Sequence, residues 1–279
     1  AKLPFAVRPL FWASLYVALE YLAHFVKIFP ENLGATQIAF PSIAQAAAIG
    51  GVPLLTFLPV FAGSALFSLR TEGKRHWPAA LAAAALLLAA QFWGSRERAA
   101  VAALPAETLR IGFVQHNMDD AEKQFAQTSQ QEVVSILVGK LLEETKRLAA
   151  ARPKPDLILW AETAYPMVFP TSAMARSGGG FAQGYANLVS ESIRALGVPV
   201  LLGGYTSDLD HDYNAGILLG RDGKVADRYL KQVLLMFGEY MPFDSYFPSL
   251  KTLNPMMGDF GRGPGAVPIQ LPWRGGKLP

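Results

Sequence analysis

Residues 198–232 read VPVLLGGYTSDLDHDYNAGILLGRDGKVADRYLKQ, and this stretch decides the fold class. Two apolar runs, 198–206 and 214–220, have the length and composition of strands. The polar tetrapeptide 221–224 contains an Asp-Gly pair, which is typical of a tight hairpin turn into the segment 224–232. We therefore predict a β-hairpin that extends a sheet begun earlier in the chain.

Upstream of this hairpin, predicted strands alternate with predicted helices. Segments 109–117 (LRIGFVQHN) and 156–163 (DLILWAET) are β-rich and apolar. Between them, Ser129-Gln-Gln-Glu132 matches a capping box and opens a helix with apolar residues at i, i+4 spacing. Residues 183–196 suit a second helix, which Gly197 stops. Strands separated by helices and followed by a hairpin favour an α/β sandwich over a purely parallel wound sheet.

The first third of the chain has a different composition. Runs 52–69 and 77–94 each contain 18 residues and no charge, at the lower end of the length that spans a bilayer. Two such runs in tandem favour a transmembrane hairpin over a pair of buried core helices. The short linker 70–76 is basic, and the positive-inside tendency places it in the cytoplasm and the chain after residue 94 outside it.

A third apolar run, 9–26, is weaker because it contains Glu20 and His24. Segment 27–51 is interrupted by proline and glycine, so we expect a re-entrant or interfacial loop rather than another span. The resulting division is a membrane domain over 1–94, a linker over 95–108 and an α/β domain over 109–279.

Composition excludes several function classes. Of the 279 residues, 51% are hydrophobic and 17% charged, below the roughly 25% charged of a typical soluble domain. The net charge of +3 comes without a basic stripe interleaved with aromatics, so no nucleic-acid partner is expected. The sequence has no cysteine, which excludes disulfides, thiolate metal sites and a cysteine nucleophile within these residues. The histidines lack ligand spacing, and we expect neither a metal nor a cofactor.

Three charged residues form the candidate catalytic set. Glu162 follows an apolar strand, Lys231 follows the hairpin, and Glu239 comes eight residues later. A strand-end carboxylate beside buried aromatics suits a general base. A nearby lysine can stabilise an oxyanion, and a second carboxylate can orient that lysine. The alternative is that Glu162 caps a loop and Lys231 is an ordinary surface charge.

Several segments resemble a known family. WAETAYP (160–166), YNAG (213–216), YLKQVLLMFGEYMPF (229–243) and FVQHNM (113–118) resemble the nitrilase superfamily. Within it, they resemble the membrane branch formed by the apolipoprotein N-acyltransferases. The first third of the chain is similar to that family's outer loop and the span that follows it.

This resemblance implies a nitrilase-like αββα sandwich, incomplete at its C-terminus and preceded by transmembrane helices. The family uses a Glu–Lys–Cys triad whose cysteine takes an acyl chain from a phospholipid as a thioester. The acyl chain then passes to the α-amine of a diacylglyceryl-cysteine apolipoprotein. Glu162 matches the family's base, Lys231 its oxyanion-stabilising lysine and Glu239 its additional glutamate. The implied setting is a multi-pass monomer of the bacterial inner membrane, with the nitrilase domain on the periplasmic face.

The same resemblance suggests substrate-binding positions, and it has one large departure. The suggested positions are Phe125, Tyr165, Asn214 and Phe237. The departure is the missing triad cysteine, and we expect the chain to be truncated before the nucleophile strand, with a degenerate homologue as the alternative. Three functions stay open: a lipoprotein N-acyltransferase, a membrane-tethered amidase or nitrile hydrolase, and an inactive nitrilase-fold binding protein.

Overall fold

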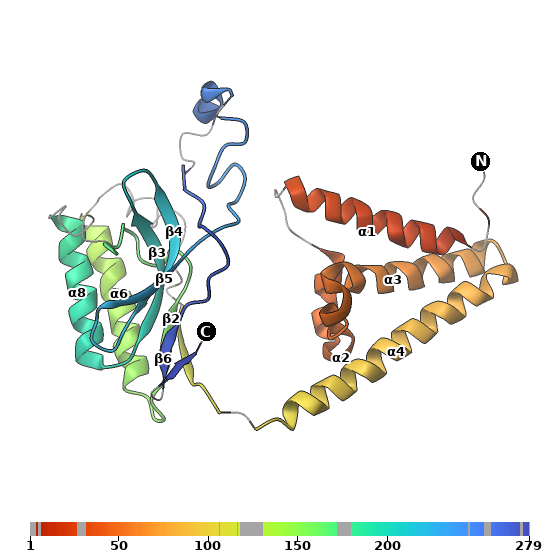
Figure 1. Cartoon of the computed structure of the whole chain (residues 1–279), viewed down its shortest axis with the longest axis horizontal. Helices are drawn as coiled ribbons and strands as arrows, with labels where there is room; N and C mark the ends of the chain where they lie inside the picture. The colour runs from red at the N-terminus through yellow and green to blue at the C-terminus, as the bar shows by residue number, and fades with distance from the viewer. Residues whose placement is uncertain are drawn as a thin grey trace. The chain divides into compact units, whose positions relative to one another are not determined.

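The computed structural model describes residues 4, 7–26, 32–105, 107–115, 117, 131–171, 180–244, 246–253, 258–273 and 276–278. The chain divides into two compact units, residues 1–106 and 107–279. Figure 1 shows a helical first unit and a mixed α/β second unit. The boundary between them falls inside the predicted linker over 95–108.

In its described residues, the first unit contains helices and no strand. Its elements are α1 (Arg8–Val26), η2 (Leu33–Ala39), α2 (Pro41–Ala44), α3 (Ala47–Thr71), η3 (Lys74–His76) and α4 (Trp77–Ala102). Among the described residues, the segments Ala47–Thr71 and Lys74–Ala102 are long and apolar enough to cross a membrane. These two segments contain the predicted spans. Helix α1 covers the weaker third run without meeting the same criterion.

Two details of the helices differ from simple apolar rods. Gly50 and Gly51 have non-helical dihedral angles, with φ of 65° at Gly51, so α3 is kinked before its apolar part begins. Helix α4 continues to Ala102, beyond the apolar run 77–94 and into the predicted linker. Alanine, arginine and glutamate are strong helix formers, so the helix persists after the apolar run has ended.

The second unit is built on a five-stranded sheet. Its elements are β1 (Ile111–Val114), α6 (Gln131–Ala149), β2 (Leu157–Trp160), α8 (Phe181–Leu196), β3 (Val200–Ser207), β4 (Asp212–Leu219), β5 (Val225–Leu230), η4 (Pro248–Leu253), β6 (Leu271–Trp273) and β7 (Gly276–Leu278). The sheet order is β1-β2-β3-β4-β5. The pairs β1–β2 and β2–β3 are parallel, whereas β3–β4 and β4–β5 are antiparallel. The predicted hairpin is confirmed as β4–β5, with Gly223 in its turn at φ 75°.

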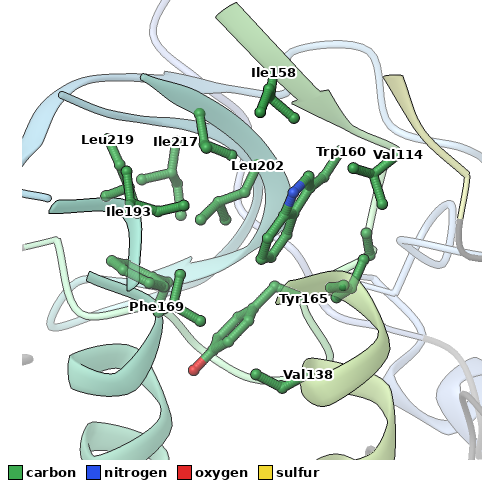
Figure 2. Close-up of a cluster of buried hydrophobic side chains, with 14 of the residues drawn as sticks. Val114, Val138, Ile158, Trp160, Tyr165, Phe169, Ile193, Leu202, Ile217 and Leu219 are labelled. Carbon is green, nitrogen blue, oxygen red and sulfur yellow. The ribbon is translucent and has the colours of Figure 1, made fainter. Parts of the chain in front are cut away.

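Helices α6 and α8 lie side by side on one face of the sheet (Figure 1). Alternate strand residues point into the layer between sheet and helices, where Trp160, Leu202 and Ile217 are buried with Tyr165 and Phe169 (Figure 2). The opposite face of the sheet packs against residues of β6 and β7. The α/β class is therefore confirmed. The described part of this unit contains one helix layer, and Ser129 of the predicted capping box lies outside it.

The topology brings the candidate residues to one end of the sheet. Strand β5 runs parallel to β2 and β3, because it is antiparallel to β4, which is itself antiparallel to β3. Glu162 follows the end of β2 and Lys231 follows the end of β5. The beginning of β4, with Asn214, lies at the same end. Three residues that are far apart in sequence are thus neighbours in space.

Candidate active site

Glu162, Lys231 and Glu239 form one charged cluster in the second unit. The Nζ atom of Lys231 lies 2.9 Å from Oε1 of Glu162 and 2.9 Å from Oε1 of Glu239. The Glu162 side chain is 63% exposed, that of Lys231 30% and that of Glu239 13%. The Lys231 ammonium therefore pairs with one solvent-accessible carboxylate, Glu162, and one shielded carboxylate, Glu239.

A strained turn presents Glu162. Thr163 has φ of 51°, a left-handed conformation that is unusual for a β-branched residue. Ala164 N donates a hydrogen bond to Ala161 O at 3.2 Å, which closes the turn directly after β2. Strained backbone of this kind is characteristic of functional sites. The turn makes Glu162 project from the strand end while Tyr165 passes into the core.

Gly203 permits this turn to lie close to β3. A Cβ atom at Gly203 would come within 2.3 Å of Ala161 O and 2.7 Å of the Glu162 Cα. Any side chain at this position would push the turn that carries Glu162 away. Gly203 was not among the residues predicted from the sequence. A glycine pair inside a predicted strand was the available signal, because it marks a close backbone approach.

Lys231 is fixed by its backbone on both sides. Its N–H donates to Asn214 O at 2.9 Å, and its carbonyl accepts from Gly263 N at 2.9 Å. Burial acts to lower the pKa of Lys231, but hydrogen bonds and charge from Glu162 and Glu239 outweigh it and raise that pKa above its ordinary value of 10.5. The ammonium is therefore charged at neutral pH, which suits an electrostatic role and not that of a proton acceptor.

Glu239 closes a compact turn beside Lys231. Its Oε2 accepts a hydrogen bond from Leu235 N at 2.8 Å, and its own N–H donates to Leu235 O at 2.8 Å. Phe237, between these two residues, has φ of 64°. The carboxylate is thus held by a backbone donor as well as by the ammonium. The orienting role of Glu239 stays a prediction.

Asn214 joins the two carboxylates. Its Nδ2 donates to Oε1 of Glu162 at 2.7 Å and to Oε1 of Glu239 at 2.8 Å. The residue is 4% exposed. Two nitrogen donors, the amide and the ammonium, therefore bridge the same pair of oxygen atoms.

The cluster borders a cavity of about 350 Å³ at this end of the sheet. Glu162, Asn214 and Lys231 supply its polar wall, and Trp160 and Tyr229 are among its other lining residues. Among the described residues, no group of three or more His, Cys, Asp or Glu could hold a metal ion. The site combines an accessible carboxylate, a fixed cation and a space large enough for a small acyl ester group.

The other predicted substrate-binding residues are dispersed. Tyr165 is fully buried in the core beside Phe169 (Figure 2), where burial raises its pKa. Phe237 is 45% exposed on the turn before Glu239. Phe125 lies outside the described residues. The structure places Tyr165 in the core, and substrate contacts for Tyr165, Phe125 and Phe237 stay predictions.

Comparison with known protein families gives consistent matches. A family model described as the apolipoprotein N-acyltransferase N-terminal domain matches residues 1–65. The chain is 30% identical over 275 residues to the apolipoprotein N-acyltransferase of Azotobacter vinelandii, covering 96% of this chain and 49% of that protein. It is 29% identical over 262 residues to the Geobacter metallireducens enzyme of the same name, covering 89% and 47%. The Bdellovibrio bacteriovorus enzyme is 31% identical over 170 residues, with 57% and 29% covered.

Similar solved structures are carbon–nitrogen hydrolases. One is an amidase from Nesterenkonia sp., with 16% identity, a TM-score of 0.35 and coverage of 62% of this chain and 54% of that chain. Another is a carbon–nitrogen hydrolase from Helicobacter pylori G27, with 14% identity, a TM-score of 0.27 and coverage of 45% and 40%.

The chain spans about half the length of the Azotobacter and Geobacter relatives. The similarity to them runs through both units, since it covers 96% and 89% of this chain. The N-terminal family model falls in the helical unit. The chain is therefore similar, through both of its units, to proteins of the apolipoprotein N-acyltransferase family.

Proposed function

We propose that the chain provides the base and the oxyanion-binding cation of an acyltransferase. In this reaction an acyl chain moves from a phospholipid to the α-amine of a diacylglyceryl-cysteine apolipoprotein. The observation that carries the proposal is the Lys231 ammonium, 2.9 Å from both the exposed Glu162 and the shielded Glu239. A fixed cation beside an accessible carboxylate is the arrangement that acyl transfer through a tetrahedral intermediate needs.

The first half-reaction requires a cysteine thiol, which these 279 residues do not contain. Glu162 takes the thiol proton while the sulfur forms a bond to the ester carbonyl carbon. The electron pair of the carbonyl moves to oxygen, and the Lys231 ammonium stabilises the resulting oxyanion. When the carbonyl re-forms, the C–O bond to the lysophospholipid breaks, and its oxygen takes the proton from Glu162. The product is a thioester.

In the second half-reaction, Glu162 accepts a proton from the amine and returns one to the thiolate. The lipoprotein amine attacks the thioester carbon and gives a proton to Glu162. Lys231 again stabilises the oxyanion, and collapse of the intermediate breaks the C–S bond and leaves an amide. The thiolate then recovers the proton from Glu162. Glu239 stays ionised throughout and orients Lys231.

We also propose a membrane setting for this chemistry. The basic turn that contains Lys74 and Arg75 supports a cytoplasmic location for the α3–α4 connection. That topology places the α/β unit on the periplasmic face of a bacterial inner membrane, as a multi-pass monomer with phospholipid and lipoprotein partners. The proposed domain division is a membrane domain over 1–94, a linker over 95–108 and a nitrilase-like domain over 109–279.

The test is to complete this chain with the sequence that the Azotobacter vinelandii relative has outside the aligned region. The purified chimera in phospholipid micelles should N-acylate a diacylglyceryl-cysteine lipopeptide. Glu162→Gln and Lys231→Met should each lower kcat by at least about 100-fold, the usual effect of removing a base or an oxyanion donor. Residues 1–279 alone should form no acylated lipopeptide.

Three outcomes would contradict the proposal. One is a monodisperse, folded chimera without acylation. Another is acylation by residues 1–279 alone, since no cysteine thioester can form there. The third is release of free fatty acid to water at the same rate with and without the amine acceptor, which would indicate a hydrolase.

A further inference from the structure

We propose that Asn214 is the positioning residue of this site, because its amide holds the Glu162 and Glu239 carboxylates together on Lys231. The inference rests on the proposed acyl-transfer function and deepens it. It assigns to Asn214 a role other than the substrate contact expected from the sequence. The evidence is the geometry around one side-chain nitrogen.

The amide hydrogens of Asn214 are fully used. A side-chain amide nitrogen carries two hydrogens, and Nδ2 of Asn214 donates one to each carboxylate, at 2.7 Å and 2.8 Å. With the residue 4% exposed, the nitrogen has no hydrogen left for a substrate. Asn214 therefore acts on the reaction through Glu162 and Glu239.

The charge balance shows why this amide is needed. Two ionised carboxylates share one ammonium, and like charges at short range oppose each other's ionisation. The Lys231 Nζ donates to both oxygens, and Asn214 donates to the same two oxygens from another side. The amide adds stabilisation to both anions without adding a charge.

The two carboxylates depend on Asn214 to different degrees. Glu239 is also held by Leu235 N at 2.8 Å and is 13% exposed. Glu162 is 63% exposed, so solvent is free to compete for its carboxylate. Removing the amide should therefore release Glu162 first and leave Glu239 in place.

Asn214 itself sits on a rigid support. It belongs to β4, which pairs with β3 on one side and β5 on the other. Its carbonyl also accepts the hydrogen bond from Lys231 N at 2.9 Å. The same residue thus fixes the backbone of the cation and the side chains of both anions.

The test measures the reactivity of the Lys231 amine in the full chain in detergent micelles. Competitive acetylation at pH 9, with mass spectrometry of each lysine and the exposed Lys224 as internal reference, reports the fraction of free amine. Losing a carboxylate partner increases that fraction. Glu162→Gln should raise the relative reactivity of Lys231 roughly threefold to tenfold, the range for a change of up to one pKa unit.

Asn214→Ala should raise the reactivity of Lys231 to a similar extent, and the double variant N214A/E162Q should match E162Q alone. Such non-additivity is expected if Asn214 acts through Glu162. The matched control is Asn187→Ala, at an exposed asparagine on α8. It should leave the reactivity of Lys231 unchanged. If N214A does not fold, Asn214→Ser keeps one donor and should give an intermediate rise.

Additive effects of N214A and E162Q, or unchanged Lys231 reactivity in a folded Asn214 variant, would overturn the inference. The labelling needs no acyl transfer, so it is independent of the proposed function. An inactive chimera with the expected labelling pattern would refute the function and leave the positioning role. In an active chimera, N214A should lower kcat with KM nearly unchanged, because substrate binding does not use the amide.

Discussion

The two units differ in the exposure of their apolar side chains. In the α/β unit, Leu202 and Ile217 are completely buried between sheet and helices. In the helical unit, Leu88 of α4 is 69% exposed and Phe92 is 67% exposed. The α/β unit buries one large apolar cluster, whereas the helical unit buries only two small ones among its described residues. Outward apolar side chains on long helices are expected where lipid is the solvent.

The units also use carboxylates differently. In the helical unit, Oε1 of Glu20 accepts a hydrogen bond from Leu33 N and Oε2 accepts one from Thr56 Oγ1, each at 2.6 Å. Thr56 in turn accepts from Gly34 N at 2.9 Å. This network ties the η2 segment to α1 and α3. In the α/β unit, the carboxylates of Glu162 and Glu239 both accept hydrogen bonds from the Lys231 ammonium, and the Glu162 carboxylate is accessible to solvent.

The largest expected effect contrasts two leucines. Leu202→Ala removes a completely buried side chain and should destabilise the α/β unit by about 2–5 kcal/mol. Leu88→Ala removes an exposed side chain and should change stability by less than about 0.5 kcal/mol in detergent. Hydrogen exchange of peptides from β3 and α4, in the full chain, measures both. Equal destabilisation by the two substitutions would mean that α4 has a protein core partner and would break the contrast.

The next effect concerns Glu20. Glu20→Ala leaves the Leu33 N–H and the Thr56 hydroxyl without this acceptor, which should cost about 1–3 kcal/mol locally. Amide exchange over residues 33–40 should accelerate by at least about fivefold, while exchange in the α/β unit stays the same. Thr56→Val removes the donor to Glu20 and the acceptor of Gly34 N, so it should also accelerate exchange over residues 33–40. Unchanged exchange in E20A would show that packing, and not this carboxylate, holds the η2 segment.

A smaller effect is the alkaline stability of the Lys231 cluster. Because folding raises the pKa of Lys231 above 10.5, its contribution is complete below pH 10.5 and is lost as the pH rises through the higher folded value. The group is partly exposed, so we expect less than about 1 kcal/mol. Lys231→Met should remove this alkaline loss, whereas Lys224→Met, on the exposed hairpin turn, should retain it. Parallel pH profiles for K231M and the parent would contradict the assignment.

Local sequence signals predicted the hairpin, whereas the members of the charged cluster were predicted from strand ends together with the family resemblance. The Asp-Gly pair at 222–223 marks the turn, and strand ends place Glu162 and Lys231 at one edge of the sheet. Helix α4 extends beyond the apolar run 77–94. The hydrophobic pattern does not predict this extension, because helix propensity decides where a helix ends.

The contacts of Asn214 and Gly203 could not be predicted from the same signals. They depend on which residues face each other across strands, and the register pairs Tyr205 with Asn214 and Gly203 with Gly216. The buried position of Tyr165 could not be predicted for a related reason. The left-handed Thr163 turns the chain after Glu162, so the residues on either side of it enter different environments.

The smallest expected effect concerns Asp208, a carboxylate in the turn that joins β3 to β4. Asp208 accepts hydrogen bonds from the backbone N–H groups of Asp210 and His211, both at 2.9 Å, and from the Tyr213 hydroxyl at 2.8 Å. The two backbone donors are the main cause that lowers the pKa of Asp208 to about 2, followed by the Tyr213 bond. Its contribution is present above the ordinary value of 3.8 and is lost as the pH falls through about 2.

Tyr213→Phe removes one of these bonds and should move the Asp208 titration partway back toward 3.8, as followed by carboxyl carbon NMR of the full chain. The rise in the Asp208 pKa should be smaller than the rise caused by losing a backbone donor. The reactivity of Lys231 toward acetylation should not change. This outcome would sharpen the comparison, because it separates a carboxylate that only shapes a turn from carboxylates that hold a cation. A change in Lys231 reactivity in Y213F would instead show that the Asp208 turn and the Lys231 cluster are coupled, since Tyr213 directly precedes Asn214 at the beginning of β4.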